Sequence, residues 1–158
     1  MATSSIPNYP EELLINGRSP DEIFEADELL FYRAPKLDER GKIGSVDVIC
    51  PNTSVNRGKY SKPIHTLYCR FPQFINWFVL EIRVGDVPKE LQSGDGKKLQ
   101  FFPVHDPTPP PEENYAHAEI RALLEQQPKK RWSALVEKQF RQILADRMQL
   151  VPPDRMNP

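Results

Sequence analysis

The alternation of apolar and polar residues is clearest in the segment WFVLEIRVGDVP, residues 77–88. Leu80 and Ile82 fall on one side of an extended chain and Glu81 and Arg83 on the other, because successive side chains of a strand point in opposite directions. The pattern therefore predicts a strand with one face in the core. After a Gly-Asp-Gly turn, KKLQFFPV is expected to return as the antiparallel partner of this strand.

A helical period marks the C-terminal part of the chain, where apolar residues recur three and four positions apart. The first predicted buried stripe comprises Trp132, Leu135, Val136, Phe140, Ile143 and Leu144. The preceding segment NYAHAEIRALLE (114–125) shows the same spacing, with Asn114 as its expected N-cap. Its predicted buried face comprises Ala116, Ile120, Leu123 and Leu124. We therefore expect two C-terminal helices.

Shorter elements are assigned from residue types and from the prolines that bound them. Residues 19–28 are expected to form a short helix, and residues 29–33 a strand. The segment SVDVIC (45–50) alternates β-branched residues and is predicted to be a strand. Residues 51–75 show no clean period and contain internal prolines, so they are predicted to form a long irregular loop.

Together these segments predict an α+β fold, in which a small, mostly antiparallel sheet packs against two C-terminal helices. We expect a loosely ordered N-terminal arm at 1–20, a single α+β domain at 21–151 and a C-terminal tail at 152–158. The chain has 17 prolines among 158 residues, many of them near the two ends, which favours this division and argues against a long helical bundle.

The composition is typical of a soluble globular protein, with 39% hydrophobic and 27% charged residues. No apolar run approaches the roughly 20 residues that cross a bilayer, and the first residues lack the pattern of a secretory signal. We therefore expect a cytoplasmic protein with no membrane partner. Two cysteines, Cys50 and Cys69, and three scattered histidines are a poor set of metal ligands, so neither a metal nor a cofactor is expected.

The net charge of −1 does not indicate a nucleic-acid binder, but the charges are unevenly distributed. Between Val48 and Leu80 there is no acidic residue, whereas cations and aromatic rings, the groups that hold single-stranded nucleic acid, are frequent. The sequence therefore predicts a binding module that contacts nucleic acid or an acidic protein partner through the basic loop 51–75. The expected ligand-binding residues of this loop are Arg57, Lys59, Tyr60, Lys62 and Arg70. In the alternative interpretation the rings anchor the loop on the core and the cations are only solvated.

The segment NYAHAEIRALLE carries the candidate chemistry of a small enzyme. His117 and Glu119 resemble the start of the site of zinc-dependent nucleobase deaminases, where a His binds zinc and a Glu transfers protons. Side chains two residues apart on a helix are separated by about 200° around its axis, so His117 and Glu119 could converge only at the helix tip. The Pro-Cys-x-x-Cys segment that completes such a zinc site does not follow Glu119. In the alternative interpretation, His117 and Glu119 belong to the first turn of an ordinary helix and form no site.

A second resemblance, to ADP-ribosyltransferases, rests on Arg33, the Thr53-Ser54 pair and Glu119. In that family an arginine, a Ser/Thr strand and a glutamate share a nicotinamide site. The alternative to the binding module is therefore a small hydrolase or transferase, deaminase-like or ADP-ribosyltransferase-like, with His117 and Glu119 as catalytic residues. In that hypothesis Arg33 and Arg121 are further polar groups that contact the ligand. The sequence leaves the substrate and the oligomeric state open.

Overall fold

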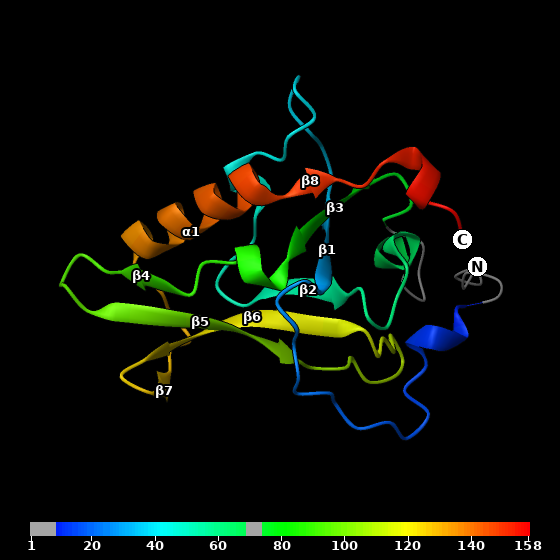
Figure 1. The fold of residues 1–158 in the computed structure, drawn as a ribbon, viewed down its shortest axis with the longest axis horizontal. Coiled ribbons are helices and arrows are strands. Elements are labelled where there is room, and N and C mark those ends of the chain that lie inside the picture. Colours follow the sequence, from blue (N-terminus) through cyan, green and yellow to red (C-terminus); the bar gives the residue numbers. More distant parts are fainter. Residues whose placement is uncertain (1–8, 69–73) are drawn as a thin grey trace.

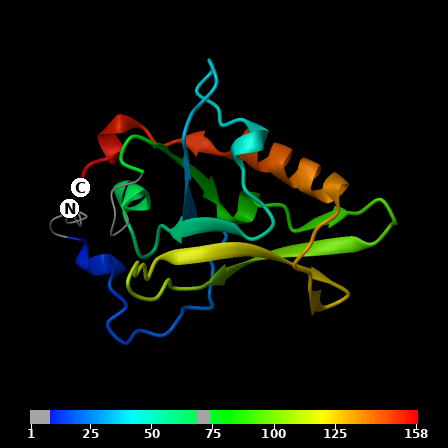
Figure 2. The same ribbon diagram turned by 180° about the vertical axis from the view of Figure 1, so that it is seen from behind.

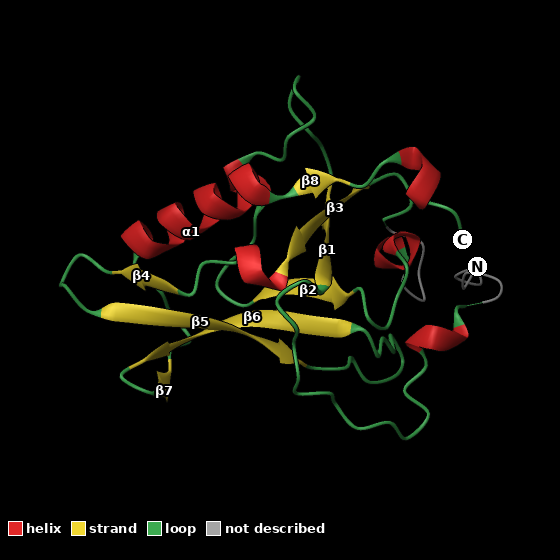
Figure 3. Cartoon of the chain, in the orientation of Figure 1, coloured by secondary structure: helices red, strands yellow, loops and turns green. Residues whose placement is uncertain are grey.

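The computed structural model describes residues 9–68 and 74–158 and has a mixed fold, in which a curled antiparallel sheet carries one long helix, α1 (Ala134–Arg147) (Figure 1). Strands and loops make up most of the remaining described chain (Figure 3). The strands are β1 (Leu29–Ala34), β2 (Thr53–Arg57), β3 (Phe78–Arg83), β4 (Glu90–Gln92), β5 (Lys98–His105), β6 (His117–Leu124), β7 (Gln127–Pro128) and β8 (Gln149–Leu150). Short 3-10 helices are η1 (Glu11–Leu13), η2 (Ser45–Asp47), η3 (Pro63–Leu67), η4 (Val84–Asp86) and η5 (Pro153–Arg155).

The strands are ordered β4-β5-β6-β2-β1-β3-β8 across the sheet, and β7 pairs with β6. Each paired neighbour runs antiparallel. The central strands β6, β2 and β1 come from three distant parts of the sequence, so side chains that are far apart along the chain become neighbours on the sheet. This arrangement positions the candidate site described below.

The two faces of the sheet bury two separate apolar clusters. The larger lies between the sheet and α1, and its fully buried members include Leu30, Leu80, Ile120, Val136, Phe140 and Leu144. The smaller lies on the opposite face and comprises Phe31, Leu67, Val79 and Val151. Leu80 and Val79 therefore face opposite clusters, as the alternation within the 77–88 segment predicts. The smaller cluster covers only the β1–β3 part of its face, because its members come from β1, β3, η3 and the chain that follows β8.

The amphipathic helix expected near residues 132–151 is confirmed as α1. The Ser133 side chain caps it by accepting a hydrogen bond from the Val136 N–H at 3.3 Å. The rings of Trp132 and Phe140 pack against Phe101 of β5, with centroids 5.0 Å apart in each pair. Leu135 was expected in the buried stripe but is 45% exposed, because it lies in the first turn, beside the end of the apolar face.

The expectation of a second C-terminal helix is wrong, because residues 117–124 form strand β6. Ala118, Ile120 and Ala122 are buried while the residues between them are not, which is the period of two of a strand. Ala116 and Ile120 are four residues apart, and that spacing fits both a helical face and a strand face. Pairing with β5 and β2 satisfies the backbone of β6 on both edges and outweighs the helix propensity of Ala, Leu and Glu. Asn114 consequently caps no helix; its Oδ1 accepts a hydrogen bond from the Ala116 N–H at 3.0 Å.

Three further expectations are corrected. The segment 97–104 does form a strand, β5, but it pairs with β4 and β6 and not with β3. The expected strand at 45–50 is the 3-10 helix η2 followed by irregular chain. The expected loop 51–75 contains β2 and η3, and its residues 69–73 lie outside the described residues.

The expected helix at 19–28 is an extended strap that crosses the ends of β5 and β6 before it enters β1 (blue in Figures 1 and 2). The guanidinium of Arg57 holds the strap, because it donates hydrogen bonds to the carbonyls of Asp21 and Ile23 at 2.6 Å each. Those carbonyls would accept from N–H groups four residues on if the strap were helical. The division into arm, domain and tail remains a prediction, and residues 1–8 lie outside the described residues. In the described chain, no helix is long and apolar enough to span a membrane.

Candidate functional site

The sheet register brings the residues of the enzyme hypothesis into two neighbouring rows. Ser54 of β2 pairs with Glu119 of β6, and Asn56 pairs with His117. On the other edge of β2, Asn56 pairs with Phe31 of β1. Arg33 lies on β1 two residues beyond Phe31, past the last paired position of β1 and β2. One row is therefore Phe31–Asn56–His117 and the next is Ser54–Glu119, both on the sheet face opposite α1, and Arg33 shares that face with Phe31.

A cavity of about 380 Å³ opens over these rows. In the described chain, the paired positions of β1 and β2 end at Phe31 and Asn56, so the strands separate where the cavity lies. Its polar lining includes Arg33, Asn52, Ser54, Asn56, Thr66, Thr108, Glu112, Asn114 and His117. Its aromatic lining includes Tyr9, Phe31, Tyr32, Tyr68, Phe74 and Trp77. Among the described residues, the cavity thus combines one cation, one carboxylate, several amides and hydroxyls, and several ring faces.

The hydroxyl of Ser54 and the imidazole of His117 form a hydrogen-bonded pair inside this cavity. The His117 Nδ1 lies 2.6 Å from the carbonyl oxygen of Asp106, and its Nε2 lies 3.2 Å from Ser54 Oγ. A carbonyl oxygen can only accept, so Nδ1 carries the proton and Nε2 of the neutral ring accepts from Ser54. A hydroxyl bonded to a base that a third group orients is the arrangement of an activated nucleophile or a proton relay.

The Asn56 side chain presents its amide N–H groups to the cavity. The Asn114 Oδ1 accepts from the backbone of Ala116, so Asn114 Nδ2 must be the atom that donates to Asn56 Oδ1, at 2.8 Å. Asn56 Nδ2 therefore points away from Asn114, and in the described chain no acceptor takes its hydrogens. Asn56 is only 6% exposed, but its Nδ2 keeps some accessible surface, since Thr66 Oγ1 is the one described side-chain polar atom that is buried without a partner. Water or a ligand in the cavity can therefore satisfy this donor.

Arg33 supplies positive charge on the opposite side of the cavity. Its guanidinium lies 3.6 Å from the centre of the Phe74 ring and donates to the carbonyl oxygen of Thr66 at 3.1 Å. The Thr66 Oγ1 is buried and has no hydrogen-bond partner in the described chain. Thr66 Oγ1 is thus closed off from the cavity, and the amide N–H groups of Asn56 are the lining donors that no described protein group accepts.

Glu119 lies at the edge of this arrangement. It shares a face of β6 with His117 and Arg121, because residues two apart on a strand point the same way. Its carboxylate accepts from Arg121 at 2.7 Å, and Arg121 also pairs with Asp106 at 2.9 Å. The His117–Glu119 pair therefore shares a strand face instead of the helix tip expected from the sequence, and Ser54 rather than Glu119 contacts the imidazole.

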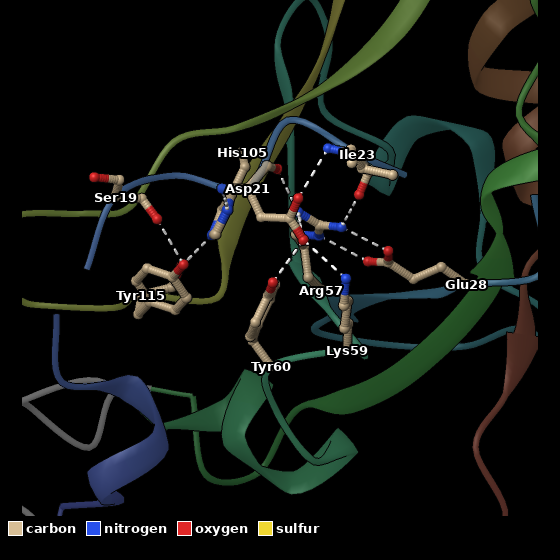
Figure 4. A network of polar contacts seen from close by, with 9 residues as sticks. All are labelled: Ser19, Asp21, Ile23, Glu28, Arg57, Lys59, Tyr60, His105 and Tyr115. Carbon is tan, nitrogen blue, oxygen red and sulfur yellow. Dashed lines mark hydrogen bonds and ion pairs between the residues drawn. The ribbon is translucent and has the colours of Figure 1, made fainter. Parts of the chain in front are cut away.

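Several residues of the basic loop are engaged inside the protein. Arg57 is fully buried, and its guanidinium forms two hydrogen bonds, at 2.7 and 2.8 Å, with the carboxylate of Glu28 (Figure 4). Lys59 Nζ and the Tyr60 hydroxyl both donate to Asp21, at 2.9 and 2.5 Å. These bonds and the Ile23 N–H hold the pKa of Asp21 far below its ordinary value, and the bond to Asp21 raises the pKa of Tyr60. Lys62 is exposed, and Arg70 lies outside the described residues. Contact of this loop with nucleic acid or an acidic partner stays a prediction.

The strap also fixes His105, a further member of this network. Its Nδ1 accepts from the Asp21 N–H at 2.8 Å and its Nε2 lies 2.6 Å from the carbonyl oxygen of Tyr115 (Figure 4). The ring is stacked against Tyr60, with centroids 5.4 Å apart. Burial lowers the pKa of His105. His105 therefore has a structural position, away from the cavity that His117 lines.

No group of three or more His, Cys, Asp or Glu in the described chain is arranged to hold a metal ion. Cys50 is buried, and desolvation raises the pKa of its thiol. Cys69 lies outside the described residues.

Asn56, Tyr68, Phe74 and Trp77 lie in the basic, aromatic stretch that the sequence predicts to bind a ligand, whereas no role in a cavity was expected for Asn114 or Thr66. No local signal marks Asn114 and Thr66, because the cavity depends on the pairing of β2 with β1 and β6. The alternation of Ser54 and Asn56 around buried Val55 was the one available hint of a polar face on β2. Comparisons of the chain with protein-family models, curated proteins and solved structures found no match.

Proposed function

We propose that this protein is a small transferase or hydrolase of ADP-ribosyltransferase-like type, which cleaves the nicotinamide glycosidic bond of a dinucleotide in the cavity. The observation that carries the proposal is that Arg33 and Ser54 line one cavity and that Ser54 pairs with Glu119 on the neighbouring strand. The resemblance noted in the sequence rests on these same three residue types. Their positions on β1, β2 and β6 give that resemblance a spatial basis, which the sequence spacing lacks.

The size and the lining of the cavity support a ligand with rings and negative charge. Its volume of about 380 Å³ lies in the range of about 300–1,000 Å³ that is usual for small-molecule sites. Arg33 can pair with a phosphate, since guanidinium groups match phosphate oxygens. The rings of Tyr68 and Trp77 can stack on a base or on nicotinamide. Asn56 offers amide N–H groups for a carboxamide or a ribose.

Glu119 is not among the residues that line the cavity, but it pairs with Ser54, which is. The proposed role of Glu119 is to stabilise, from the edge of the cavity, the positive charge that develops on the ribose when the glycosidic bond breaks. Its carboxylate is paired with Arg121, whose side chain is 37% exposed. Ion pairs of such exposure contribute only about 0–1 kcal/mol, so a bound cationic ring can replace Arg121 at little cost. Ser54 pairs with Glu119, lines the cavity together with Arg33 and can bond to the ribose.

The proposal is tested by incubating the purified protein with NAD and measuring nicotinamide release by chromatography, alongside NAD binding by calorimetry. We expect Arg33→Ala to weaken binding, and Glu119→Gln to lower the rate about 100-fold or more with binding retained. Arg131→Ala and Glu125→Gln are matched controls, because both residues are exposed and lie away from the cavity lining. Absence of both NAD binding and nicotinamide release from the wild-type protein would contradict the proposal.

A further inference from the structure

We infer that His117 is the general base of this site. Through the hydroxyl of Ser54, it takes up the proton of the water or hydroxyl group that attacks the ribose. The inference rests on the proposed function, and it goes beyond the ADP-ribosyltransferase resemblance, which includes Arg33, Ser54 and Glu119 but not His117. It names the group that activates water, or the hydroxyl of a second substrate, for attack on the ribose.

The first observation is the tautomer of His117. The Asp106 carbonyl oxygen, 2.6 Å from Nδ1, requires a proton on that nitrogen. The neutral ring then has its lone pair on Nε2, which faces Ser54 Oγ at 3.2 Å. Because the Asp106 carbonyl belongs to the backbone at the end of β5, the ring is oriented before any substrate binds.

The second observation is the position of the competing carboxylates. Glu119 accepts from Arg121 and is absent from the cavity lining, while His117 belongs to it. Glu112 also lines the cavity but lies in the exposed loop before β6, and it does not contact Ser54. Ser54 therefore delivers its proton to the imidazole, and Glu119 is left to stabilise positive charge.

The third observation is that Asn56 lies in the same row as His117 and its amide N–H groups face the cavity. A ring or carboxamide oxygen bound by Asn56 would lie beside Ser54, since the two residues are neighbours on one face of β2. The substrate is thereby held next to the relay.

The bond between the ribose carbon and the nicotinamide nitrogen breaks, and its electron pair leaves with the nicotinamide. The oxygen of water forms the new bond to that carbon and gives a proton to Ser54 Oγ, while the Ser54 proton moves to His117 Nε2. The products are nicotinamide, the ribosyl product and a protonated imidazole, which returns its proton to solvent.

The first test compares His117→Ala with His117→Gln in nicotinamide release from NAD. Gln can accept a hydrogen bond from Ser54 but cannot take up its proton, so we expect both variants to lose about 100-fold in kcat with KM little changed. Added imidazole should restore part of the activity to His117→Ala. A His117→Gln variant with wild-type kcat would overturn the inference while leaving the proposed function intact.

The second test needs no substrate. Nitrogen-15 spectra of the imidazole should show a proton on Nδ1 and none on Nε2, and Ser54→Ala should shift the Nε2 resonance. A proton on Nε2 would overturn the inference whatever the substrate. Absence of NAD cleavage by the wild-type protein, together with the expected tautomer, would instead contradict the proposed function and the acceptor role while confirming the relay geometry.

Discussion

Arg57 and Glu28 form a buried ion pair: Arg57 Nη2 lies 2.7 Å from Glu28 Oε1, and the two side chains are 0% and 6% exposed. The guanidinium also donates to two carbonyls of the strap and lies 3.7 Å from the centre of the Phe24 ring. Every one of these partners precedes β1 in the sequence. Arg57, which the sequence predicts to bind a ligand from the basic loop, therefore fixes the path of the chain into the sheet.

Replacement of Arg57 by Met should destabilise the protein by roughly 3–5 kcal/mol, because the carboxylate of Glu28 would remain buried without its partner. Urea unfolding followed by tryptophan fluorescence measures the change. Arg155→Met is the matched control, since Arg155 forms an equally short pair with Glu81 at 41% exposure and should cost at most about 1 kcal/mol. Equal effects of the two substitutions would contradict the structural role given to Arg57.

His105 should make stability depend on pH. In the neutral form of the ring, both nitrogens form hydrogen bonds. Burial lowers the pKa of His105 in the folded protein below its ordinary value of 6.5. The unfolded chain then binds the proton more readily, so stability is fully present above about pH 6.5 and falls as the pH drops toward the folded pKa. His65 shifts in the same direction.

Urea midpoints at pH 7.5 and at pH 5 give the measurement for this effect. The loss between the two pH values should be smaller in His105→Asn than in the wild-type protein, although the variant is less stable at both. An undiminished loss in His105→Asn would assign the pH dependence to other groups.

The aromatic cluster beneath α1 should be the most sensitive part of the main core. Phe140 is fully buried and contacts the rings of Phe101 and Trp132, with centroids 5.0 and 4.9 Å away. Truncation to Ala should cost about 3–5 kcal/mol, through lost burial and the cavity left behind. Leu135→Ala, on the same helix at 45% exposure, should change the free energy of unfolding far less; a comparable loss would place Leu135 in the core.

Asn114 should act on ligand affinity through Asn56. In Asn114→Ala the Asn56 amide loses the partner that orients it, so NAD binding should weaken by about 3- to 10-fold, the value of one hydrogen bond. Calorimetry gives the affinity, and the exposed Asn76→Ala is the control. Unchanged affinity in Asn114→Ala would show that the orientation of Asn56 does not matter for the ligand.

Where a local pattern was specific, the sequence predicted the structure. The stripe ending at Leu144 led to α1, and the alternation around Leu80 led to β3. The segment around Ile120 was predicted wrongly, because its apolar spacing fits a helix and a strand alike and only pairing with β2 and β5 decides between them. The prediction of a helix at 19–28 was wrong for a similar reason, since the carbonyls of this strap accept hydrogen bonds from Arg57 and not from local N–H groups.

The same distinction applies to the candidate site: its residue types can be found in the sequence, but their proximity cannot. The sequence indicates Arg33, Ser54 and Glu119 through one resemblance and His117 and Glu119 through another, but it does not relate Ser54 to His117. Ser54 and His117 are 63 positions apart, and no local period relates them. Only the order β6-β2-β1 and its register place them in one cavity.

By itself, therefore, the sequence determined the elements whose apolar period is unambiguous and the chemical groups available for a site. The tertiary structure alone decided which strand pairs with which, whether residues 117–124 extend or coil, and which cations remain for a ligand. The physical reason is that backbone pairing and buried charge depend on partners distant in the chain, whereas amphipathic period is a property of neighbours.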